Sequence, residues 1–299
     1  MSTSTRRPDP ASAPRQNVVD CQDLFKIYKR AELEVVALRG LDLQVAAGEF
    51  IAVVGASGSG KTTLLNILAG LDRPSAGRVM VGERDLLTLT EKDLVTYRRW
   101  EVGFVWQTVS RNLLPYLTAR DNVALPMAIG GKDEGERHQR ATDLLTTLGL
   151  GSMTDRYPNQ LSGGEQQRVA IAVALANNPL MVLADEPTGE LDTHTAVDVF
   201  QGLRAVAETY NTTVVMVTHY PGVARYVDRV VQIRDGRLST EVIMRPTFRG
   251  SGENALEEYV LVDAAGRLQL PEDMLEQLQL QGRVKVETLE DRVVIRHVG

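Results

Sequence analysis

The chain has 299 residues, of which 43% are hydrophobic and 24% charged, and its formal net charge is −6. This composition is ordinary for a water-soluble protein and leaves room for one large domain and one small one. A protein whose main partner is nucleic acid usually carries excess positive charge, so the acidic balance argues against that class. The single cysteine, Cys21, excludes an internal disulfide and fits a reducing compartment. No apolar run reaches the roughly 18 residues that cross a bilayer, and no apolar signal core is present, so we expect a cytoplasmic protein.

The chain divides into a tail and a large α/β region. Residues 1–16 are rich in Pro, Ser and Arg, a composition typical of a disordered tail. Residues 17–240 alternate short apolar runs with helical patterns, which predicts an α/β domain with a largely parallel inner sheet. Three continuously apolar runs have the composition of strands buried on both faces, and each ends in polar residues, where such sheets place their sites. These runs are Ile51–Val54, Leu180–Ala184 and Val214–Thr218.

Between the apolar runs, residues 112 to about 160 are polar with a helical pattern and contain no strand signal. We therefore expect a helical subdomain, with bounds of about 108–170. A Gly-, Ser- and Arg-rich break predicts a linker at 241–253. The remaining residues, 254–299, are expected to form a separate small α+β module.

The stretch GASGSGKTT, beginning at Gly55, satisfies the spacing of a P-loop. Its glycines let backbone N–H groups close around a phosphate, and the helix that follows adds its positive N-terminus. Lys61 would reach the outer phosphates, and the Thr62 hydroxyl would bind Mg²⁺. A chance glycine loop before a helix is the alternative, but the apolar strand before it and the leucine-rich helix after it disfavour that interpretation.

Two acidic residues, Asp185 and Glu186, follow the apolar run that begins at Met181. Asp185 at the strand end is placed to hold Mg²⁺, and Glu186 beside it could polarise an attacking water. An acidic strand-to-loop turn without catalytic function is the alternative. Its combination with a P-loop favours nucleotide hydrolysis.

Residues 161–168 read LSGGEQQR. Ser162 with Glu165 fits a capping box, so an ordinary helix start is one interpretation. A serine with two glycines at a helix N-terminus is also a second anion site, which most P-loop enzymes lack.

These three motifs together resemble the ATP-binding subunits of ATP-binding-cassette (ABC) transporters, over about residues 18–240. Tyr28 matches the aromatic residue that stacks on adenine in that family, and Gln107 the glutamine that links metal and water to the helical subdomain. Asp192 matches the loop that signals across the dimer, and His219 the histidine that contacts the γ-phosphate. Each match alone has a plainer explanation: a core tyrosine, a loop glutamine, a helix-capping aspartate or a strand-end histidine. Their order along the chain favours the family.

The resemblance implies a P-loop NTPase fold of ABC type, with a mixed sheet core, and ATP and Mg²⁺ as cofactors. By the same resemblance, the catalytic residues are Lys61, Gln107, Glu186 and His219, and the metal ligands are Thr62, Gln107 and Asp185. The implied nucleotide-binding residues are Tyr28, Gly55, Ser57, Gly58, Ser59, Gly60, Lys61, Thr62, Thr63, Ser162, Gly164, Gln166 and Asp192.

The family resemblance also implies a head-to-tail homodimer, in which Ser162 and Gly164 of one chain complete the ATP site at Lys61 of the other. Within the family, the runs GLDRP and NVALPM are similar to the branch of lipoprotein-release, macrolide-export and cell-division ATPases. That branch implies separate multi-span permease partners, and a location on the inner face of the cell membrane through the permease.

The last residues carry a second resemblance. Short strands are expected at 259–262, 284–286 and 293–295, and a helix at 271–280. The run VDAAGRLQLPEDM, beginning at Val262, resembles the swapped-hairpin module of AbrB/MazE-type proteins, which implies an intertwined dimer. About 45 residues can scarcely bury a stable core alone, which also favours dimerisation over the alternative of a solitary packed domain. Residues 254–299 contain five Lys or Arg and nine Asp or Glu, so DNA binding, which that family often shows, is disfavoured.

Two functions other than transport remain open from the sequence. One is a soluble ABC-type ATPase of DNA repair or translation, which usually has two cassettes, long coiled coils or zinc-binding inserts; this chain has one cassette and one cysteine. The other is a DNA-binding regulator that uses ATP as a signal, against which the acidic charge argues.

Overall fold

A computed structural model describes residues 16–30, 33–245, 255–263, 266–278, 280, 284–289 and 292–297. The expected tail lies outside the described residues except for Gln16. Within the described part, no helix combines the length and hydropathy that a membrane span requires.

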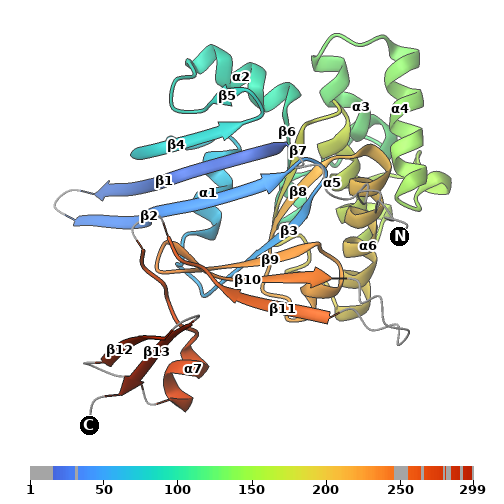
Figure 1. Ribbon diagram of the computed structural model, residues 1–299. Coiled ribbons are helices and arrows are strands. Elements are labelled where there is room, and N and C mark those ends of the chain that lie inside the picture. The colour runs from blue at the N-terminus through green and yellow to red at the C-terminus, as the bar shows by residue number, and fades with distance from the viewer. Residues whose placement is uncertain are drawn as a thin grey trace, which may run out of the picture.

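The centre of the molecule is a seven-stranded sheet with the strand order β11-β10-β9-β3-β8-β7-β6 (Figure 1). Five adjacent strands are parallel, as the three continuously apolar runs predict, and β10 and β11 are antiparallel additions at one edge. The strands are β3 (Phe50–Val54), β6 (Val102–Val105), β7 (Met181–Asp185), β8 (Thr213–Val217), β9 (Arg229–Arg234), β10 (Arg237–Arg245) and β11 (Ala255–Val260).

A second, antiparallel sheet has the order β2-β1-β4-β5. Its strands are β1 (Asn17–Arg30), β2 (Leu33–Ala46), β4 (Ala76–Val81) and β5 (Arg84–Asp85). Helix α1 (Lys61–Leu68) joins this sheet to the large one, because its buried side chains belong to one apolar cluster with strands of both. Cys21 lies in that cluster, where burial raises the pKa of its thiol far above the ordinary range, so the thiol is inert.

The other face of the large sheet is covered by helices that form a second apolar cluster with its strands. Between β6 and β7 the chain forms no strand, in agreement with the helical segment expected there. The longer helices are α2 (Glu91–Trp100), α3 (Ala119–Ile129), α4 (Glu134–Thr147), α5 (Gly163–Leu175) and α6 (Thr193–Tyr210). Short 3₁₀ turns are η2 (Val109–Arg111), η3 (Gly151–Met153), η4 (Pro158–Gln160) and η5 (Val223–Arg225).

The large α/β domain (the cassette), expected to end at residue 240, extends further along the chain than expected. β10 continues to Arg245, so the first residues of the expected linker are strand, and β11 pairs with β10 through Tyr259 opposite Glu241. The strand that the sequence analysis assigned to the small unit therefore extends the large sheet instead. The pairing follows from the exposed edge of β10, which offers backbone groups that an extended segment can satisfy.

The C-terminal unit contains α7 (Glu272–Gln277), β12 (Val284–Leu289) and β13 (Arg292–His297). The two strands, expected at 284–286 and 293–295, pair as an antiparallel hairpin, and Figure 1 shows them beside α7 and apart from the two larger sheets. The unit meets the cassette through an ion pair between Arg237 and Asp263 at 3.0 Å.

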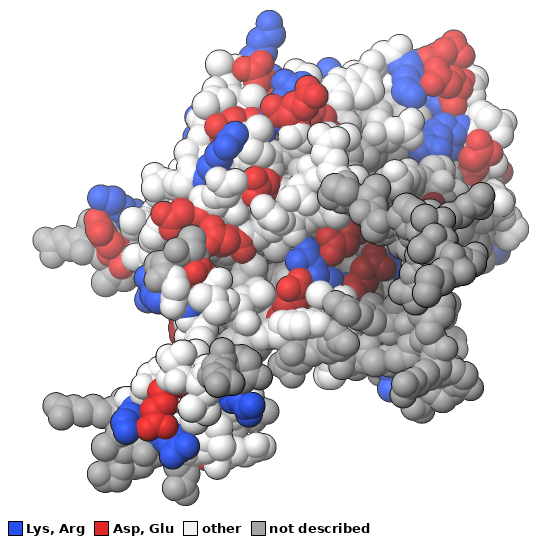
Figure 2. All heavy atoms as spheres, viewed as in Figure 1, with Lys and Arg blue, Asp and Glu red and all other residues white. Residues whose placement is uncertain are grey.

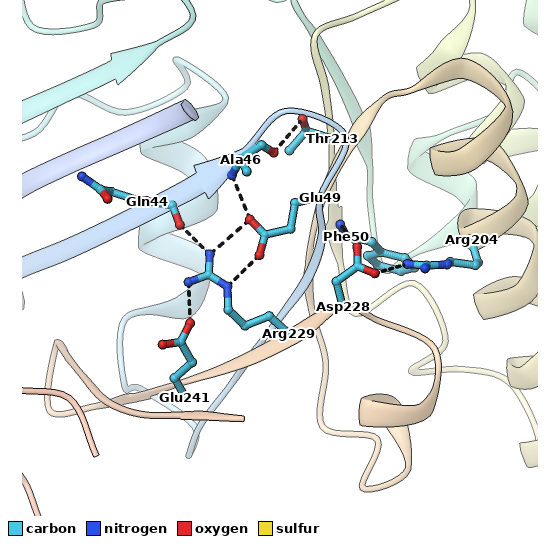
Figure 3. Close-up of polar contacts among 9 residues, drawn as sticks. All are labelled: Gln44, Ala46, Glu49, Phe50, Arg204, Thr213, Asp228, Arg229 and Glu241. Carbon is cyan, nitrogen blue, oxygen red and sulfur yellow. Dashed lines mark hydrogen bonds and ion pairs between the residues drawn. The ribbon is translucent and has the colours of Figure 1, made fainter. Parts of the chain in front are cut away.

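The amino ends of the central strands are fixed by a polar network (Figure 3). The Arg229 guanidinium at the start of β9 lies 2.7 Å from a Glu49 oxygen and 2.6 Å from a Glu241 oxygen, and it donates to the Gln44 carbonyl. Burial alone would lower the pKa of Arg229, but the two carboxylates outweigh it and hold that pKa above its ordinary value.

Asp228, the residue before Arg229, accepts hydrogen bonds from the Phe50 backbone and from Arg204. The network therefore ties both sheets and α6 together at one edge.

Replacing Arg229 with alanine is expected to lower the free energy of unfolding by about 2–4 kcal/mol, because Glu49 and Glu241 would remain largely buried without a cation. Urea unfolding followed by circular dichroism measures this. Arg137→Ala removes a looser pair with Glu134 on the surface of α4 and should change stability by less than about 0.5 kcal/mol. Equal stability of the two variants would contradict the role of the network.

Candidate functional site: a phosphate-binding loop at the ends of parallel strands

The candidate site lies at the carboxyl ends of three parallel strands. β3 leads into the P-loop, β7 ends at Asp185, and β8 leads to His219. Because the three strands are neighbours in one sheet, segments that are far apart in the sequence meet at one edge.

The P-loop has a backbone that only glycine accommodates at its two ends. A Cβ on Gly55 would lie 2.2 Å from the Ile233 carbonyl oxygen, and one on Gly60 would lie 2.6 Å from that of Ala37. Gly60, at φ 109°, is the N-cap of α1, so the helix begins directly at Lys61 with its N–H groups directed into the loop. The sequence prediction of a glycine loop between strand and helix is therefore met in three dimensions.

Lys61 lies inside this loop, with only 5% of its surface exposed. Its ammonium group donates to the carbonyls of Gly55 and Ala56, both at 2.9 Å. Burial lowers the pKa of Lys61, while the charges of Glu186 and Asp185 oppose that shift. The side chain is thus a positive charge at the centre of a ring of backbone groups, which suits a phosphate.

Asp185, at the end of β7, and Thr62, in the first turn of α1, lie close enough for the Thr62 hydroxyl to influence the pKa of Asp185. Burial raises the pKa of Asp185, and the neighbouring Glu186 charge adds to the shift, while Lys61 and Thr62 oppose it. Two of the three expected metal ligands therefore lie near each other.

Glu186 and His219 also meet. His219 Nε2 lies 2.7 Å from Glu186 Oε1. Glu186 has a positive φ of 46°, and its backbone N–H donates to the Val217 carbonyl. A left-handed backbone is unfavourable for a residue with a side chain, and such strain is common at functional sites. The turn directs the carboxylate back toward the end of β8.

Gln107, which follows β6, lies against the loop after Glu186. A Cβ on Gly189 would be 3.0 Å from Gln107 Nε2, so the amide and this glycine are in contact. The third expected metal ligand therefore lies against the loop that follows Glu186.

Tyr28 lies near the end of β1, with 37% of its surface exposed, and its phenol lies close enough to the Thr63 side chain of α1 for Thr63 to lower its pKa against the larger effect of burial. The core-tyrosine alternative is thus disfavoured, since much of the ring faces solvent. Sequence reasoning did not single out two neighbours of this ring, Lys26 and Asp72. Lys26 could have been found from the sequence, because residues two apart in a strand share a face and Lys26 is two residues from Tyr28.

The remaining P-loop residues expected to bind nucleotide differ in exposure. Ser57 and Gly58 are exposed, whereas Ser59 is buried and its hydroxyl has no hydrogen-bond partner. The Ser59 carbonyl accepts from Gly236, which fixes the loop to the turn after β9.

The second anion site begins at Ser162, the N-cap of α5. The capping box expected from the sequence is present, since Glu165 and Ser162 exchange hydrogen bonds between side chain and backbone. Gly164 packs against α6, because a Cβ there would lie 2.1 Å from a Thr195 methyl carbon. The Gln166 amide donates to the Leu161 carbonyl. Within the part of the chain that the structure describes, no hydrogen bond or ion pair joins these residues to the P-loop.

Asp192 is the N-cap of α6, and its carboxylate accepts from the backbone of His194 and Thr195 and from the Thr195 hydroxyl. These hydrogen bonds hold the pKa of Asp192 below its ordinary value. Within one chain, Asp192 therefore acts as a helix cap, which is the plainer explanation given by the sequence.

Known proteins resemble this chain over most of the region that contains the site. The family model described as "ABC transporter" matches residues 38–189. The chain belongs to the ABC transporter family. It is 46% identical to the "Lipoprotein-releasing system ATP-binding protein LolD" of Cytophaga hutchinsonii. The match covers 74% of this chain and 98% of that relative. It is 44% identical over 75% of its length to the "Macrolide export ATP-binding/permease protein MacB" of Syntrophobacter fumaroxidans, but spans only 32% of that relative.

Among solved structures, the ABC cassette MJ0796, described as dimeric, in a post-hydrolysis state and bound to ADP and Pi, superposes with a TM-score of 0.68. It is 41% identical, and the match covers 77% of this chain and all of that one, so about a quarter of this chain has no counterpart there. The predictions of an ABC-type fold, of nucleotide binding and of an ABC ATPase are confirmed by the family and by this neighbour.

Lys61→Ala is expected to weaken ATP binding about 100-fold, because the loop would lose its only charged donor and keep two carbonyls turned inward. Fluorescence titration with a labelled ATP analogue measures the dissociation constant. Lys132→Ala, which removes a surface pair with Glu136, should bind as the wild type does. Retention of wild-type affinity by Lys61→Ala would show that the lysine does not hold the phosphates.

Proposed function

We propose that two copies of this chain bind ATP between them and that ATP hydrolysis drives a separate multi-span membrane permease. The observation that carries the proposal is the contact of Glu186 with His219, at 2.7 Å, near Thr62 and Asp185. A carboxylate beside a phosphate loop can accept a proton from an attacking water, and the contact with the histidine holds it in place.

In this proposal the P-loop and Lys61 bind the phosphates, and Tyr28 stacks on the adenine. Glu186 accepts the proton of the attacking water as the water oxygen bonds to the γ-phosphorus and the bond to the leaving ADP oxygen breaks. His219 keeps the carboxylate oriented and lies near the γ-phosphate. Gln107 responds to ATP hydrolysis, since it touches the loop that follows Glu186.

The residues present fit Mg²⁺. The Thr62 hydroxyl lies close enough to the Asp185 carboxylate to lower its pKa, and the Gln107 amide lies against Gly189 of the loop that follows Glu186. Hydroxyl, carboxylate and amide oxygens are ligands that Mg²⁺ accepts, together with substrate phosphates. When bound, the ion supplies charge neutralisation of the outer phosphates.

Two copies are proposed because Ser162, Gly164 and Gln166 make no described hydrogen bond or ion pair with their own P-loop. The exposed N-terminus of α5 is therefore available for the phosphates held by a second chain. Asp192, which caps α6 next to Gly164, would signal between the two ATP sites of the dimer. The relative MJ0796 is described as dimeric.

A permease partner is proposed from the relatives. The name of the MacB relative joins an ATP-binding part and a permease in one chain, and this chain spans only about a third of it. The LolD relative, described as the ATP-binding protein of a lipoprotein-releasing system, is matched over nearly its whole length. We infer that this chain likewise acts at the inner face of a membrane, through a permease encoded separately.

Glu186→Gln is expected to retain ATP binding and to lower the turnover number at least about 1000-fold, because the amide cannot accept the proton of water. ATP should then hold the variant as a dimer, which size-exclusion chromatography with light scattering detects. Glu190→Gln, a neutralisation four residues away on the exposed loop, serves as the matched control and should turn over ATP. Wild-type turnover by Glu186→Gln would mean that another group is the base.

The same trapped variant tests the permease. Tagged Glu186→Gln, incubated with ATP and the organism's detergent-solubilised membranes, should recover a multi-span protein in stoichiometric amount. Recovery of a homodimer without a membrane protein would favour a soluble ABC-type ATPase instead.

For the C-terminal unit we propose pairing with the same unit of a second chain, as an AbrB/MazE-like module would. The face of the hairpin formed by Val284, Val286, Val293 and Ile295 is apolar, and Val286 and Val293 remain 60% and 62% exposed. Such a small unit needs more covered apolar surface to be stable. A second copy is the partner that the proposed cassette dimer brings close.

Val286→Glu combined with Val293→Glu is expected to weaken dimerisation without ATP at least about tenfold, because two carboxylates would lie on the apolar face. Analytical ultracentrifugation measures the dimer constant. Lys285→Glu with Arg292→Glu changes the opposite face and is the control. An unchanged constant in the valine variant would remove the hairpin face from the interface.

DNA binding is not favoured by the charge distribution. On the face drawn in Figure 2, the described Lys and Arg side chains are interspersed with Asp and Glu and form no continuous basic patch. Phosphate contacts along a duplex require such a patch.

A further inference from the structure

The aromatic ring of Tyr28 is held by a polar cluster that the proposed function does not use. The Tyr28 hydroxyl donates to Asp72 Oδ2 at 2.7 Å. Lys26 Nζ lies 2.5 Å from the other carboxylate oxygen and 4.7 Å from the centroid of the Tyr28 ring. Hydrogen bonds and charge from Lys26 and Tyr28 hold the pKa of Asp72 below its ordinary value, although burial opposes this.

The end of β1 needs such support because its partner strand on one side stops short. β1 pairs with β4 only as far as Phe25 opposite Ala76, whereas Tyr28 lies three residues further on. Beyond Phe25 the loop that carries Asp72 takes the place of a strand. Ser75 accepts from the Ile27 backbone at 2.9 Å, and the Ser75 backbone donates to the Phe25 carbonyl at 2.8 Å.

This support fixes the ring in two ways. The bond to Asp72 restricts rotation of the phenol, and the Lys26 ammonium is in cation–π contact with the ring. A group that is ordered before binding loses less conformational entropy when a ligand stacks on it. The hydroxyl is engaged with Asp72, and 37% of the residue's surface stays exposed, so the ring can still receive a ligand.

We propose that Asp72, assisted by Lys26, is a positioning residue that orders the Tyr28 ring as a platform for the adenine base. The inference rests on the stacking role proposed for Tyr28. Asp72 acts through the tyrosine and touches no reacting atom, so its removal weakens nucleotide binding and leaves the chemical step unchanged.

The test compares Asp72→Ala, Tyr28→Phe and the double variant in steady-state ATPase assays of the full chain. Each single variant is expected to raise KM for ATP about 3- to 10-fold and to leave kcat within about twofold. In the double variant the two effects should not add, because both substitutions break the same hydrogen bond. Asp143→Ala, which removes a carboxylate from the surface of α4, is the matched control and should behave as wild type.

Inorganic tripolyphosphate, which has no base, separates positioning from damage to the P-loop. Its inhibition constant should stay within about twofold in Asp72→Ala. A rise equal to the rise in KM would overturn the proposal, since Asp72 would then act on phosphate binding through Thr63.

Tyr28→Ala distinguishes failure of this inference from failure of the stacking role. If Tyr28→Ala raises KM and Asp72→Ala does not, stacking stands and the positioning proposal is wrong. If Tyr28→Ala leaves KM unchanged, the stacking role fails, and the positioning proposal fails with it.

Discussion

The P-loop is held between the two sheets by backbone contacts that leave no space for a side chain at Gly55 or Gly60. The carbonyl of Ile233 closes one end of the loop and that of Ala37 the other. The turn after β9 adds a third contact, since Gly236 donates to the Ser59 carbonyl and accepts from Arg39. The loop therefore keeps its shape through parts of the fold distant in sequence, and the side chain of Lys61 is enclosed as a consequence.

In the large sheet, the amino ends of the strands carry stabilising contacts, and the carboxyl ends carry the candidate site. At the amino ends, Arg229 and Asp228 are satisfied by closely packed partners, and the sheets are joined there. At the carboxyl ends, Asp185 and Glu186 lie close together, and burial raises the pKa of Asp185. Like charges held near each other in a partly buried place are unfavourable for folding, and the well-paired opposite edge can offset that cost.

The C-terminal unit approaches the nucleotide site more closely than its position in the sequence indicates. Leu270 and Pro271 line a cavity of about 540 Å³ together with the first half of the P-loop and the end of β9. Arg234 at the end of β9 donates to the Leu270 carbonyl at 3.4 Å. β11, which precedes the unit in the chain, is itself paired with β10, so the unit follows directly on a strand of the large sheet.

The sequence by itself determined the fold class, the parallel inner sheet and nearly all the candidate residues. Uninterrupted apolar runs specify buried strands, and the glycine spacing before Lys61 specifies a phosphate loop, because both patterns are local. Only the tertiary structure decided which of these residues meet. The contact of Glu186 with His219, the position of Gln107 against Gly189 and the support of Tyr28 by Asp72 each join segments separated by at least thirty residues. The pairing of β11 with β10 was also decided there, because an exposed strand edge accepts any nearby extended segment and leaves no signal in that segment's own residues.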